Sequence, residues 1–418
     1  MSDYKLVARL SRRNWILMSP IYAIAPRYVE YLHSRRYAHD TIQSYLASLA
    51  HFAHWLSEHR FDISDINDAL VAKFVDTHLP SCRCPRPCMY RAATIHASLQ
   101  HLLAILKERN LGCRTQQQTP IDIELKLYRE YLVDICGCAQ TTCNARLGIV
   151  RRMLSSIFDN APVAFAQLTP EKLGNFITRS STGRKSATYR ANCVCLTSYL
   201  RFRALQGNET RALLAAIPHM APPMPTRLPV TMRDSELTTF FSAFDLSTPI
   251  GMRDFAIARC MADLALRRME VLRLHIESFN WREGTLTLSH NKSQRERNLP
   301  LPVQTAKAIV RYLKEGRPVT NNRAIFVRHI APFDDPLGVG AINDLIERAL
   351  VRAGLDHQFH GTHLFRRTAA TRMVLGGVSL KEIADTLGHK SLNSTKVYTR
   401  VDLNRLRSMA QAWPGSTS

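Results

Sequence analysis

The stretch HLFRRTAAT spans residues 363–371 of this chain. His363 and Arg366 lie three residues apart in it, so a helix would place both side chains on one face. The small and polar residues that follow Arg366 suit close packing against another helix. On its own, a histidine in such a place is usually structural or solvated. The stretch therefore predicts a packed helix first, and a chemical role for His363 and Arg366 only if other residues support one.

Downstream, the chain carries a second histidine and then a tyrosine. Leu387-Gly388-His389 places His389 directly after a glycine, which predicts the end of one helix or the start of the next. Tyr398 follows nine residues later, in the segment TKVYTR. A single tyrosine is more often a half-buried core residue than a reactive group, so Tyr398 alone carries no functional prediction.

Upstream, Arg267 and Lys292 are each open to two interpretations. The segment 264–274 predicts an apolar helix interrupted by charge, in which Arg267 and Glu270 share a face. A buried arginine needs an anion, which is either this carboxylate, as a structural ion pair, or a phosphate. Lys292 lies between two strand-like segments, near the tip of a hairpin, where a long cation can reach into a groove. The alternative for Lys292 is a solvated basic turn.

The composition restricts the class of protein. With 418 residues and a hydrophobic fraction of 45%, the chain is long enough for two or three folded domains. Its formal net charge of +22 predicts a polyanionic partner, with nucleic acid first and an anionic membrane surface second. No apolar run is long enough to span a membrane, and Pro20 interrupts the stretch that faintly resembles a signal peptide. We expect the ten cysteines to be reduced thiols in a cytoplasmic protein.

We interpret the N-terminal half as a duplication. Tyrosine, glutamate, leucine and threonine positions within residues 28–41 recur at a constant offset within 128–141. Each copy predicts about four amphipathic helices. A chance similarity between two small helical bundles is the alternative. The proline-rich segment that follows excludes a helix, so we predict domains at 1–115 and 116–215, a linker at 216–230 and a third domain at 231–418.

Short strand signals lie in the third predicted domain, at 279–281, 285–288 and 298–301. The turn Arg282-Glu283-Gly284 suits a hairpin between the first two. The remaining segments predict helices. We therefore expect a mainly α fold, in which helical bundles are followed by a mixed α+β domain with a small antiparallel sheet.

A cluster of soft metal ligands lies in the first predicted bundle and consists of His78, Cys82, Cys84 and Cys88. Four such side chains could hold zinc tetrahedrally, although the Cys-x-Cys-x-x-x-Cys spacing is not a common zinc finger. Reduced loop thiols and a redox role are the alternatives. The second copy of the repeat lacks the cluster, so the bundle itself does not require it.

Taken together, the segments of the third domain form one pattern. It consists of Leu-Arg-x-x-Glu at 266–270, Lys292 ahead of Arg-x-x-Pro-Leu at 297–301, His-x-x-Arg at 363–366, Leu-Gly-His at 387–389, and Tyr398. This pattern resembles the catalytic domain of the tyrosine recombinase (phage integrase) family, over residues 231–405. The two helical repeats resemble, more loosely, the SAM-like core-binding domain of that family, present twice.

The resemblance implies a catalytic role for six residues: Arg267, Lys292, His363, Arg366, His389 and Tyr398. The tyrosine would attack a DNA phosphorus and leave a covalent link to the 3′ end. The arginines would clamp the non-bridging oxygens, and the lysine would protonate the departing 5′ oxygen. His363 would assist proton transfer, and His389 would donate a hydrogen bond to the phosphate. Glu270 would orient Arg267 or its helix. The resemblance implies neither a cofactor nor a catalytic metal.

Three positions depart from the family pattern. Ala265 stands where the family often has glycine, Arg268 where an apolar residue is commoner, and Arg367 where the family often shows histidine. Because each catalytic arginine has an arginine after it, Arg268 and Arg367 are alternative candidates for the two phosphate clamps.

The resemblance implies a site-specific recombinase or integrase that acts on double-stranded DNA as a homotetramer, in the integration or transposition of a mobile element. It implies no membrane and no small-molecule substrate. A type IB topoisomerase-like activity is the first alternative, because it uses the same kind of pocket to relax supercoils. A non-catalytic DNA-binding protein is the second.

Overall fold

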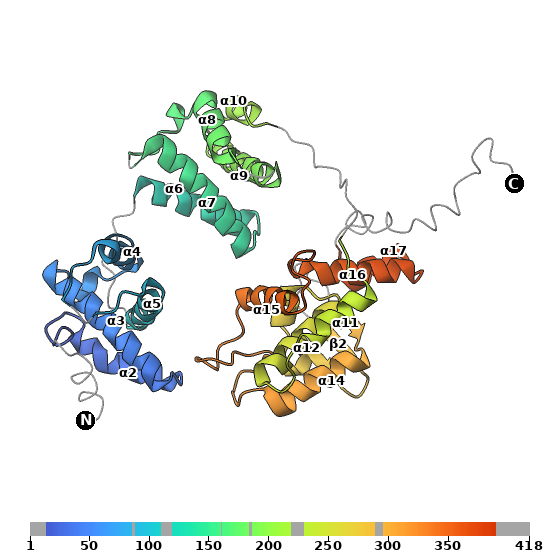
Figure 1. The fold of residues 1–418 in the computed structure, drawn as a ribbon. Coiled ribbons are helices and arrows are strands. Elements are labelled where there is room, and N and C mark those ends of the chain that lie inside the picture. Colours follow the sequence, from blue (N-terminus) through green and yellow to red (C-terminus); the bar gives the residue numbers. More distant parts are fainter. Residues whose placement is uncertain are drawn as a thin grey trace. The chain divides into compact units, whose positions relative to one another are not determined.

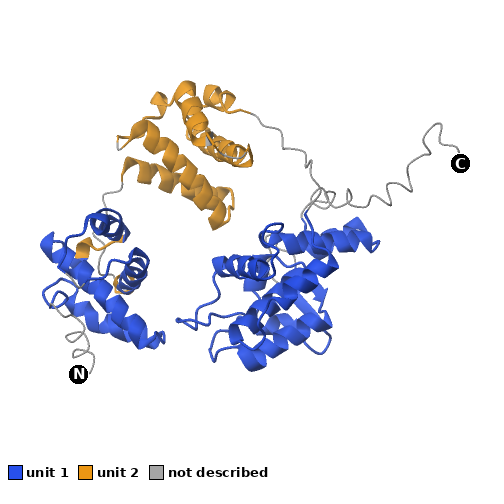
Figure 2. Ribbon diagram, in the orientation of Figure 1, with its two compact units in different colours: residues 1–63, 68–105, 225–418 blue, residues 64–67, 106–224 orange. Residues whose placement is uncertain are grey.

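The computed structural model describes residues 14–85, 88–109, 119–159, 161–183, 186–218, 230–288 and 296–389. The described chain is mainly helical and contains a small antiparallel sheet, as predicted (Figure 1). It divides into two compact units, formed by residues 1–63, 68–105 and 225–418 and by residues 64–67 and 106–224 (Figure 2). None of the described helices combines the length and the apolar character needed to cross a bilayer.

The first helical set covers residues 22–108. Its elements are η1 (Tyr22–Ile24), α2 (Ala25–Ser34), α3 (His39–Glu58), η2 (Ile63–Asp65), α4 (Asp68–Lys73), η3 (Phe74–His78), η4 (Leu79–Ser81) and α5 (Ala92–Glu108). Apolar residues of α3 at helical spacing form one side of the core, because Ile42, Leu46 and Phe52 are almost fully buried. Phe52 packs edge-on against Phe74 of η3, which closes the core from the opposite side.

The second helical set covers residues 120–215. Its elements are α6 (Pro120–Glu130), η5 (Tyr131–Ile135), α7 (Gln140–Phe158), η6 (Phe165–Gln167), α8 (Pro170–Ser181), α9 (Ser186–Leu205) and α10 (Arg211–Ala215). Helix α8 begins with Pro170 at its first position and with the Thr169 hydroxyl accepting from the amide of Lys172 at 3.3 Å. Such a cap satisfies one of the amide groups left unpaired at a helix start.

The two helical sets share an order of elements and a buried hydrogen bond. In each set a helix of about ten residues precedes a long helix, a 3₁₀ turn, a further helix and a last long helix. The Tyr28 hydroxyl lies 2.9 Å from Ser98 Oγ, and the Tyr128 hydroxyl donates to Ser198 Oγ at 2.9 Å. The first pair joins α2 to α5 and the second joins α6 to α9, so each pair links the first α-helix of a set to its last long helix. This correspondence favours the interpretation of the N-terminal half as a duplication, while the predicted domain limits stay predictions.

The third set covers residues 234–387 and carries the sheet. Its helices are α11 (Asp234–Ser242), α12 (Pro249–Asp263), α13 (Arg268–Leu272), α14 (Val303–Arg311), α15 (Val339–Arg352), α16 (His363–Leu375) and α17 (Leu380–Leu387), with turns η7 (Ile276–Ser278) and η8 (Tyr312–Gly316). Helix α12 is central, because it packs against α14, α15 and α16. Its start requires a glycine, since a Cβ at Gly251 would lie 1.8 Å from the Asp245 carbonyl oxygen.

The sheet consists of β1 (Phe279–Asn280), β2 (Thr285–Leu288) and β3 (Arg297–Pro300), in that order and antiparallel. The predicted strands are confirmed, with the third beginning one residue earlier than expected. Leu286 and Leu288 of β2 point into the core, as the period-two pattern requires. Leu288 pairs with Arg297, so the segment 289–295 connects two strand ends that are held together by the ladder.

Candidate active site

Arg267 stands at a sharp reversal between two helices. Helix α12 ends at Asp263, Ala265 adopts a positive φ of 53°, and Arg267 is the N-cap of α13. The backbone amide of Arg267 donates to Glu270 Oε2 at 2.8 Å, and its Nη1 donates to Glu270 Oε1 at 2.9 Å. Glu270 is buried, so one carboxylate both caps the helix and fixes the guanidinium. About a third of the Arg267 side chain, 33%, remains exposed to solvent.

The predicted continuous helix over residues 264–274 is wrong. The structure has a short helix, α13 (Arg268–Leu272), after a non-helical turn. A residue with positive φ cannot lie inside a right-handed helix, and Ala265 supplies that break. Arg267 and Glu270 do contact each other, but across a helix cap and not along a helix face.

Arg366 enters the same region from α16. Only 5% of this residue is exposed, and its Nη1 donates to the Ala265 carbonyl oxygen at 2.7 Å. Its Nη2 donates to the carbonyl oxygen of Leu387, the last residue of α17. Arg366 therefore links the reversal before α13 to the end of α17. The prediction of a packed helix is confirmed, because Thr368, Ala369, Ala370 and Thr371 are all buried.

His389 follows directly on the end of α17. This helix begins with a capping box, in which Ser379 and Glu382 exchange hydrogen bonds, and it ends at Gly388 in the left-handed conformation. Gly388 is needed for a second reason, since a Cβ there would lie 2.9 Å from Cζ of Arg297. The carbonyl oxygen of Gly388 accepts from Arg267 Nη2 at 3.1 Å. The end of α17 thus brings His389 next to the groups that hold Arg267 and Arg366.

Arg297 contributes to this region, although the sequence analysis gave it no role. It is the first residue of β3, and its side chain is 9% exposed. Its Nη2 lies 2.7 Å from Glu270 Oε1, and its Nη1 donates to the Thr386 carbonyl oxygen at 2.5 Å. Glu270 therefore balances two guanidinium groups. The signal that could have identified Arg297 was its place at the head of the Arg-x-x-Pro-Leu segment.

The electrostatic surroundings keep both histidines neutral. Burial, with the positive charges of Arg366, Arg267 and Arg297, lowers the pKa of His389 to about 4. Burial and the charge of Arg366 also lower the pKa of His363, which lies one helical turn before Arg366 on α16. At neutral pH the positive charge of the region therefore resides on the arginines. A neutral imidazole can accept a proton at one nitrogen and donate a hydrogen bond from the other.

Four of the six candidate residues are described, and these four come together. Arg267, Arg366 and His389 are joined through the Ala265, Leu387 and Gly388 carbonyl groups, and His363 lies on the same helix as Arg366. The alternative candidates Arg268 and Arg367 are both exposed. Lys292 and Tyr398 lie outside the described residues, as do most of the predicted linker and the C-terminal tail.

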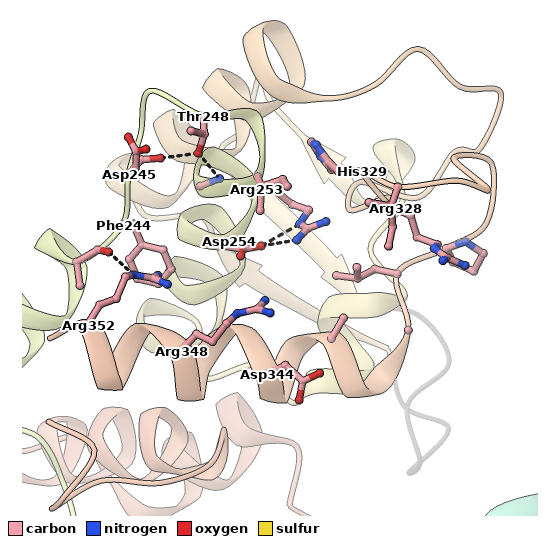
Figure 3. Close-up of a pocket in the computed structure, with 18 of the residues that line it drawn as sticks. Phe244, Asp245, Thr248, Arg253, Asp254, Arg328, His329, Asp344, Arg348 and Arg352 are labelled. Carbon is pink, nitrogen blue, oxygen red and sulfur yellow. Dashed lines mark hydrogen bonds and ion pairs between the residues drawn. The ribbon is translucent and has the colours of Figure 1, made fainter. Parts of the chain in front are cut away.

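A separate cavity also lies in this part of the chain. It has a volume of about 890 Å³ and is lined by α12, α15 and residues 328–338 (Figure 3). Arg253, Arg328, Arg348 and Arg352 face it, together with Asp245, Asp254, Asp335 and Asp344. Positive and negative groups are thus equal in number, and Arg253 is paired with Asp254 at 2.7 Å. None of the four described candidates lines this cavity, so we assign it no part in the site.

Comparisons with known proteins agree with the pattern of residues. The model of the phage integrase family matches residues 231–405, and that of the phage integrase N-terminal SAM-like domain matches residues 25–111. A Sinorhizobium fredii protein named as an integrase/recombinase, y4gC, is 35% identical over 185 residues, which are 44% of this chain and 95% of that protein. The chain belongs to the tyrosine recombinase (phage integrase) family. Tyrosine recombinases catalyse the cleavage and rejoining of DNA strands, so the protein is an enzyme of DNA recombination.

Longer matches extend the relationship over nearly the whole recombinase. The Sinorhizobium fredii integrase/recombinase y4rA is 29% identical over 392 residues, 93% of each chain. Among solved structures, the XerH site-specific recombinase bound to difH superposes with a TM-score of 0.55 at 18% identity, over 72% of this chain and 98% of that one. The Tn1549 transposon integrase in complex with transposon right end DNA gives 0.53 at 14% identity, over 68% and 99%. These likenesses establish the fold.

Proposed function

We propose that this recombinase cuts and rejoins double-stranded DNA through a covalent 3′-phosphotyrosyl intermediate formed on Tyr398. The observation that carries the proposal is the convergence of Arg267, Arg366 and His389 at the end of α17. The chain continues from this point toward Tyr398, nine residues after His389. Nine extended residues span up to about 30 Å, which allows the tyrosine to serve its own subunit or a neighbouring one.

Arg267 and Arg366 are the groups we assign to the phosphate. Their guanidiniums are held by carbonyl oxygens and by Glu270, which sets their orientation before DNA binds. Preorganised donors stabilise charge that develops in the transition state more than mobile ones do. The planar fork of arginine also matches two phosphate oxygens and keeps its charge at any working pH.

Lys292 is the group we assign to the departing 5′ oxygen. It lies in the segment 289–295, whose ends are paired as Leu288 and Arg297. Arg297 contacts Glu270 and Thr386, so the base of this segment is anchored to the residues that hold Arg267 and His389. From this anchored segment, the Lys292 side chain can approach the phosphate that we assign to Arg267 and Arg366. We call Arg297 a positioning residue, because it acts through Glu270 and the end of α17.

The proposed reaction exchanges one phosphoester bond for another in each of its two steps. The phenolic oxygen of Tyr398 attacks phosphorus and loses its proton, the bond from phosphorus to the 5′ oxygen breaks, and that oxygen gains a proton from Lys292. His363, neutral at pH 7, can accept the phenolic proton, and His389 can donate a hydrogen bond to a non-bridging oxygen. A 5′ hydroxyl of a second duplex then attacks the phosphotyrosine in the reverse sense. The phosphodiester energy is retained throughout.

We further propose that the active assembly is a homotetramer on two duplexes and that the reaction inserts or moves a mobile element. Exchange between two duplexes requires two cuts in each, and one subunit supplies one tyrosine. The duplicated helical set suggests a DNA site longer than the core, and footprints confined to one short core would contradict this. A cytoplasmic setting agrees with the free thiols of the described cysteines. The net charge of +22 predicts binding that weakens steeply with salt.

The decisive experiment uses nicked suicide substrates made from the DNA that borders the coding sequence. Wild-type protein should form an adduct that resists denaturant, and the Tyr398→Phe variant should form none. Tyr22→Phe, a partly exposed tyrosine of the first helical set, is the matched control and should behave as wild type. An adduct that persists in Tyr398→Phe, or one that maps to another peptide, would overturn the assignment of the nucleophile.

A second assay separates recombination from simple relaxation. Two differently marked duplexes are incubated with the protein, in parallel with one supercoiled plasmid that carries a single site. Joined products between the two markers support recombination. Relaxation of the plasmid without any joined product would instead favour a type IB topoisomerase-like activity.

A further inference from the structure

Four soft side chains converge in the first helical set, and none of them is a candidate active site residue. They are His51 from α3, His78 from η3, and Cys82 and Cys84 from the segment that follows η4. One ligating atom of each lies within 4.8 Å of all the others. His51 is fully buried, Cys84 is buried, and the other two are half-buried. Such a group is unusual inside a small helical bundle, where most of the buried side chains are apolar.

We propose that His51, His78, Cys82 and Cys84 form a structural zinc site. Zinc in closed structural sites is held by four nitrogen or sulfur ligands in a tetrahedron, and two histidines with two cysteines are one of its common sets. All four positions are filled by protein side chains, which leaves no coordination position for water or substrate. The site is therefore structural, and it is independent of the recombination chemistry proposed for the third set.

The distances between the ligating atoms match the edges of a zinc tetrahedron. Bond lengths of about 2.0–2.1 Å to nitrogen and about 2.3 Å to sulfur give edges of about 3.3 Å between two nitrogens and about 3.6 Å between nitrogen and sulfur. His51 Nε2 lies 3.3 Å from His78 Nε2 and 3.3 Å from Cys82 Sγ. His78 Nε2 lies 3.5 Å from Cys84 Sγ. All three distances thus lie within about 0.3 Å of the edges of such a tetrahedron.

The surroundings orient these ligands as a metal site requires. His51 Nδ1 lies 2.7 Å from the Met89 carbonyl oxygen, which can only accept, so Nδ1 carries the proton and Nε2 presents its lone pair to the cluster. The amide of Cys84 donates to Cys82 Sγ at 3.4 Å, a contact that stabilises a thiolate.

The structure changes the set of ligands suggested by the sequence. Cys88 was part of that set, but its sulfur lies 4.0 Å from the Cys84 carbonyl oxygen and outside the cluster. His51 takes its place from α3, where it follows the apolar pattern of a core helix and so gave no separate signal. A long-range contact of this kind becomes visible only when α3, η3 and the segment 82–84 are folded together.

A bound zinc would fix the connection between η4 and α5. In the described part of this connection, the Tyr90 hydroxyl donates to the Cys84 carbonyl oxygen at 3.4 Å. Zinc would attach this segment to α3 and η3 through four bonds. We therefore expect metal removal to loosen the first helical set and to leave the third set unchanged.

A second group near Cys84 is the competing candidate. His54, Glu58 and Cys84 also place ligating atoms within 4.8 Å of one another. This group supplies three ligands and includes an exposed glutamate, which already lies 3.3 Å from His54 Nε2 as an ion pair. A zinc bound there would leave a coordination position open, and it would not require His51 or His78. The two sites can therefore be separated by substitution.

The test uses the full chain, purified under reducing conditions and dialysed against metal-free buffer. Zinc content is measured by plasma mass spectrometry, and the coordination is measured by zinc K-edge X-ray absorption and by the visible spectrum after exchange with Co²⁺. We expect about one zinc per chain, held by two sulfur and two nitrogen atoms in a tetrahedron. Zinc should be lost in His51→Gln, His78→Gln and Cys82→Ser, and the melting temperature of the first helical set should fall on adding a chelator.

Two control variants sharpen the result. Cys88→Ser removes a neighbouring thiol outside the cluster, and Glu58→Gln removes the acid of the competing group; both should retain zinc. Loss of zinc in Cys88→Ser with retention in His51→Gln would overturn the proposed ligand set. Because a ligand variant can fail to fold, the absorption spectrum of the wild-type protein decides independently. A wild-type chain that binds no zinc when the metal is supplied, or binds it through three sulfurs or one, would reject the site.

Discussion

The buried guanidinium of Arg366 donates to the carbonyl oxygen of Ala265, 2.7 Å away and 101 residues earlier in the chain. Ala265 is one of the few residues other than glycine with a positive φ in the described chain, and it is 1% exposed. The reversal at Ala265 separates α12 from α13 and places Arg267 at a helix cap. One strained residue thus connects the positions of both arginines that we assign to the phosphate.

The first prediction concerns this strain. A left-handed conformation costs an alanine about 1–2 kcal/mol. Ala265→Gly removes this strain. It also removes a buried methyl group, which costs about 0.8 kcal/mol of stability, and the greater backbone freedom of glycine in the unfolded chain costs about 0.5–1 kcal/mol more. We therefore expect the free energy of unfolding of the variant to lie within about 1 kcal/mol of the wild-type value. The free energy of unfolding is obtained from hydrogen exchange of the amides in α16.

The matched control is Ala258→Gly, in the interior of α12 and equally buried. No strain is relieved there, so the helix propensity and the lost methyl add to a destabilisation of about 2 kcal/mol. Equal losses at the two positions would show that the conformation of Ala265 stores no strain.

A second prediction distinguishes Arg366 from its neighbour Arg367. Arg366 donates to carbonyl oxygens of Ala265 and Leu387 at once, which a lysine ammonium on a single flexible stem does not reproduce. We expect Arg366→Lys to slow adduct formation on a suicide substrate by about 100-fold or more. Arg367→Lys, at an exposed position, should change the rate by no more than a few-fold. The opposite ranking would move the phosphate clamp to Arg367.

The sequence predicted most of this arrangement where the signal was local. The end of α17 at Gly388 and the strand at residues 285–288 each depend on neighbouring residues, and both were found. The four described candidates were singled out because their spacing along the chain resembles a known family, and the fold brings them together, while their catalytic roles stay predictions.

Predictions failed where the decisive contact joins distant segments. The break at Ala265 depends on packing against α16, so the apolar run from 264 to 274 gave no sign of it. Arg297 contacts Glu270 and Thr386, which lie 27 and 89 residues away. His51 joins its cysteines across a similar gap in sequence. Such contacts form only when distant segments are folded together, so they produce no periodic pattern in the sequence.

A third prediction concerns pH. The pKa of His389 falls from its ordinary value of 6.5 to about 4 in the folded protein. Between these values the unfolded chain binds a proton that the folded chain does not, so stability decreases as the pH falls from about 6.5 toward about 4. We expect the melting temperature of the third set to drop between pH 7.5 and pH 5. His363, whose pKa is also lowered, acts in the same direction.

His389→Gln tests this assignment, because glutamine does not titrate. Comparing each protein with itself at the two pH values removes the packing effect of the substitution. The variant should lose less stability than the wild type over this interval, although some loss remains through His363. A decline of the same size in both proteins would show that His389 does not carry the effect.

The fourth prediction uses the hydrogen bonds shared by the two helical sets. Tyr28 and Tyr128 are both fully buried, and each hydroxyl contacts a serine 70 residues later. Tyr28→Phe and Tyr128→Phe should each reduce the free energy of unfolding by about 1 kcal/mol. Hydrogen exchange should become faster only in α2 and α5 for Tyr28→Phe, and only in α6 and α9 for Tyr128→Phe. In the first variant the Ser98 hydroxyl keeps the Tyr45 carbonyl oxygen, 2.9 Å away, as a partner, while the contact of the Tyr28 hydroxyl with the Ser98 carbonyl oxygen at 3.0 Å is also lost. If either substitution accelerated exchange in both sets, the two could not be independent folding units, and the interpretation of a duplicated domain would lose its physical basis.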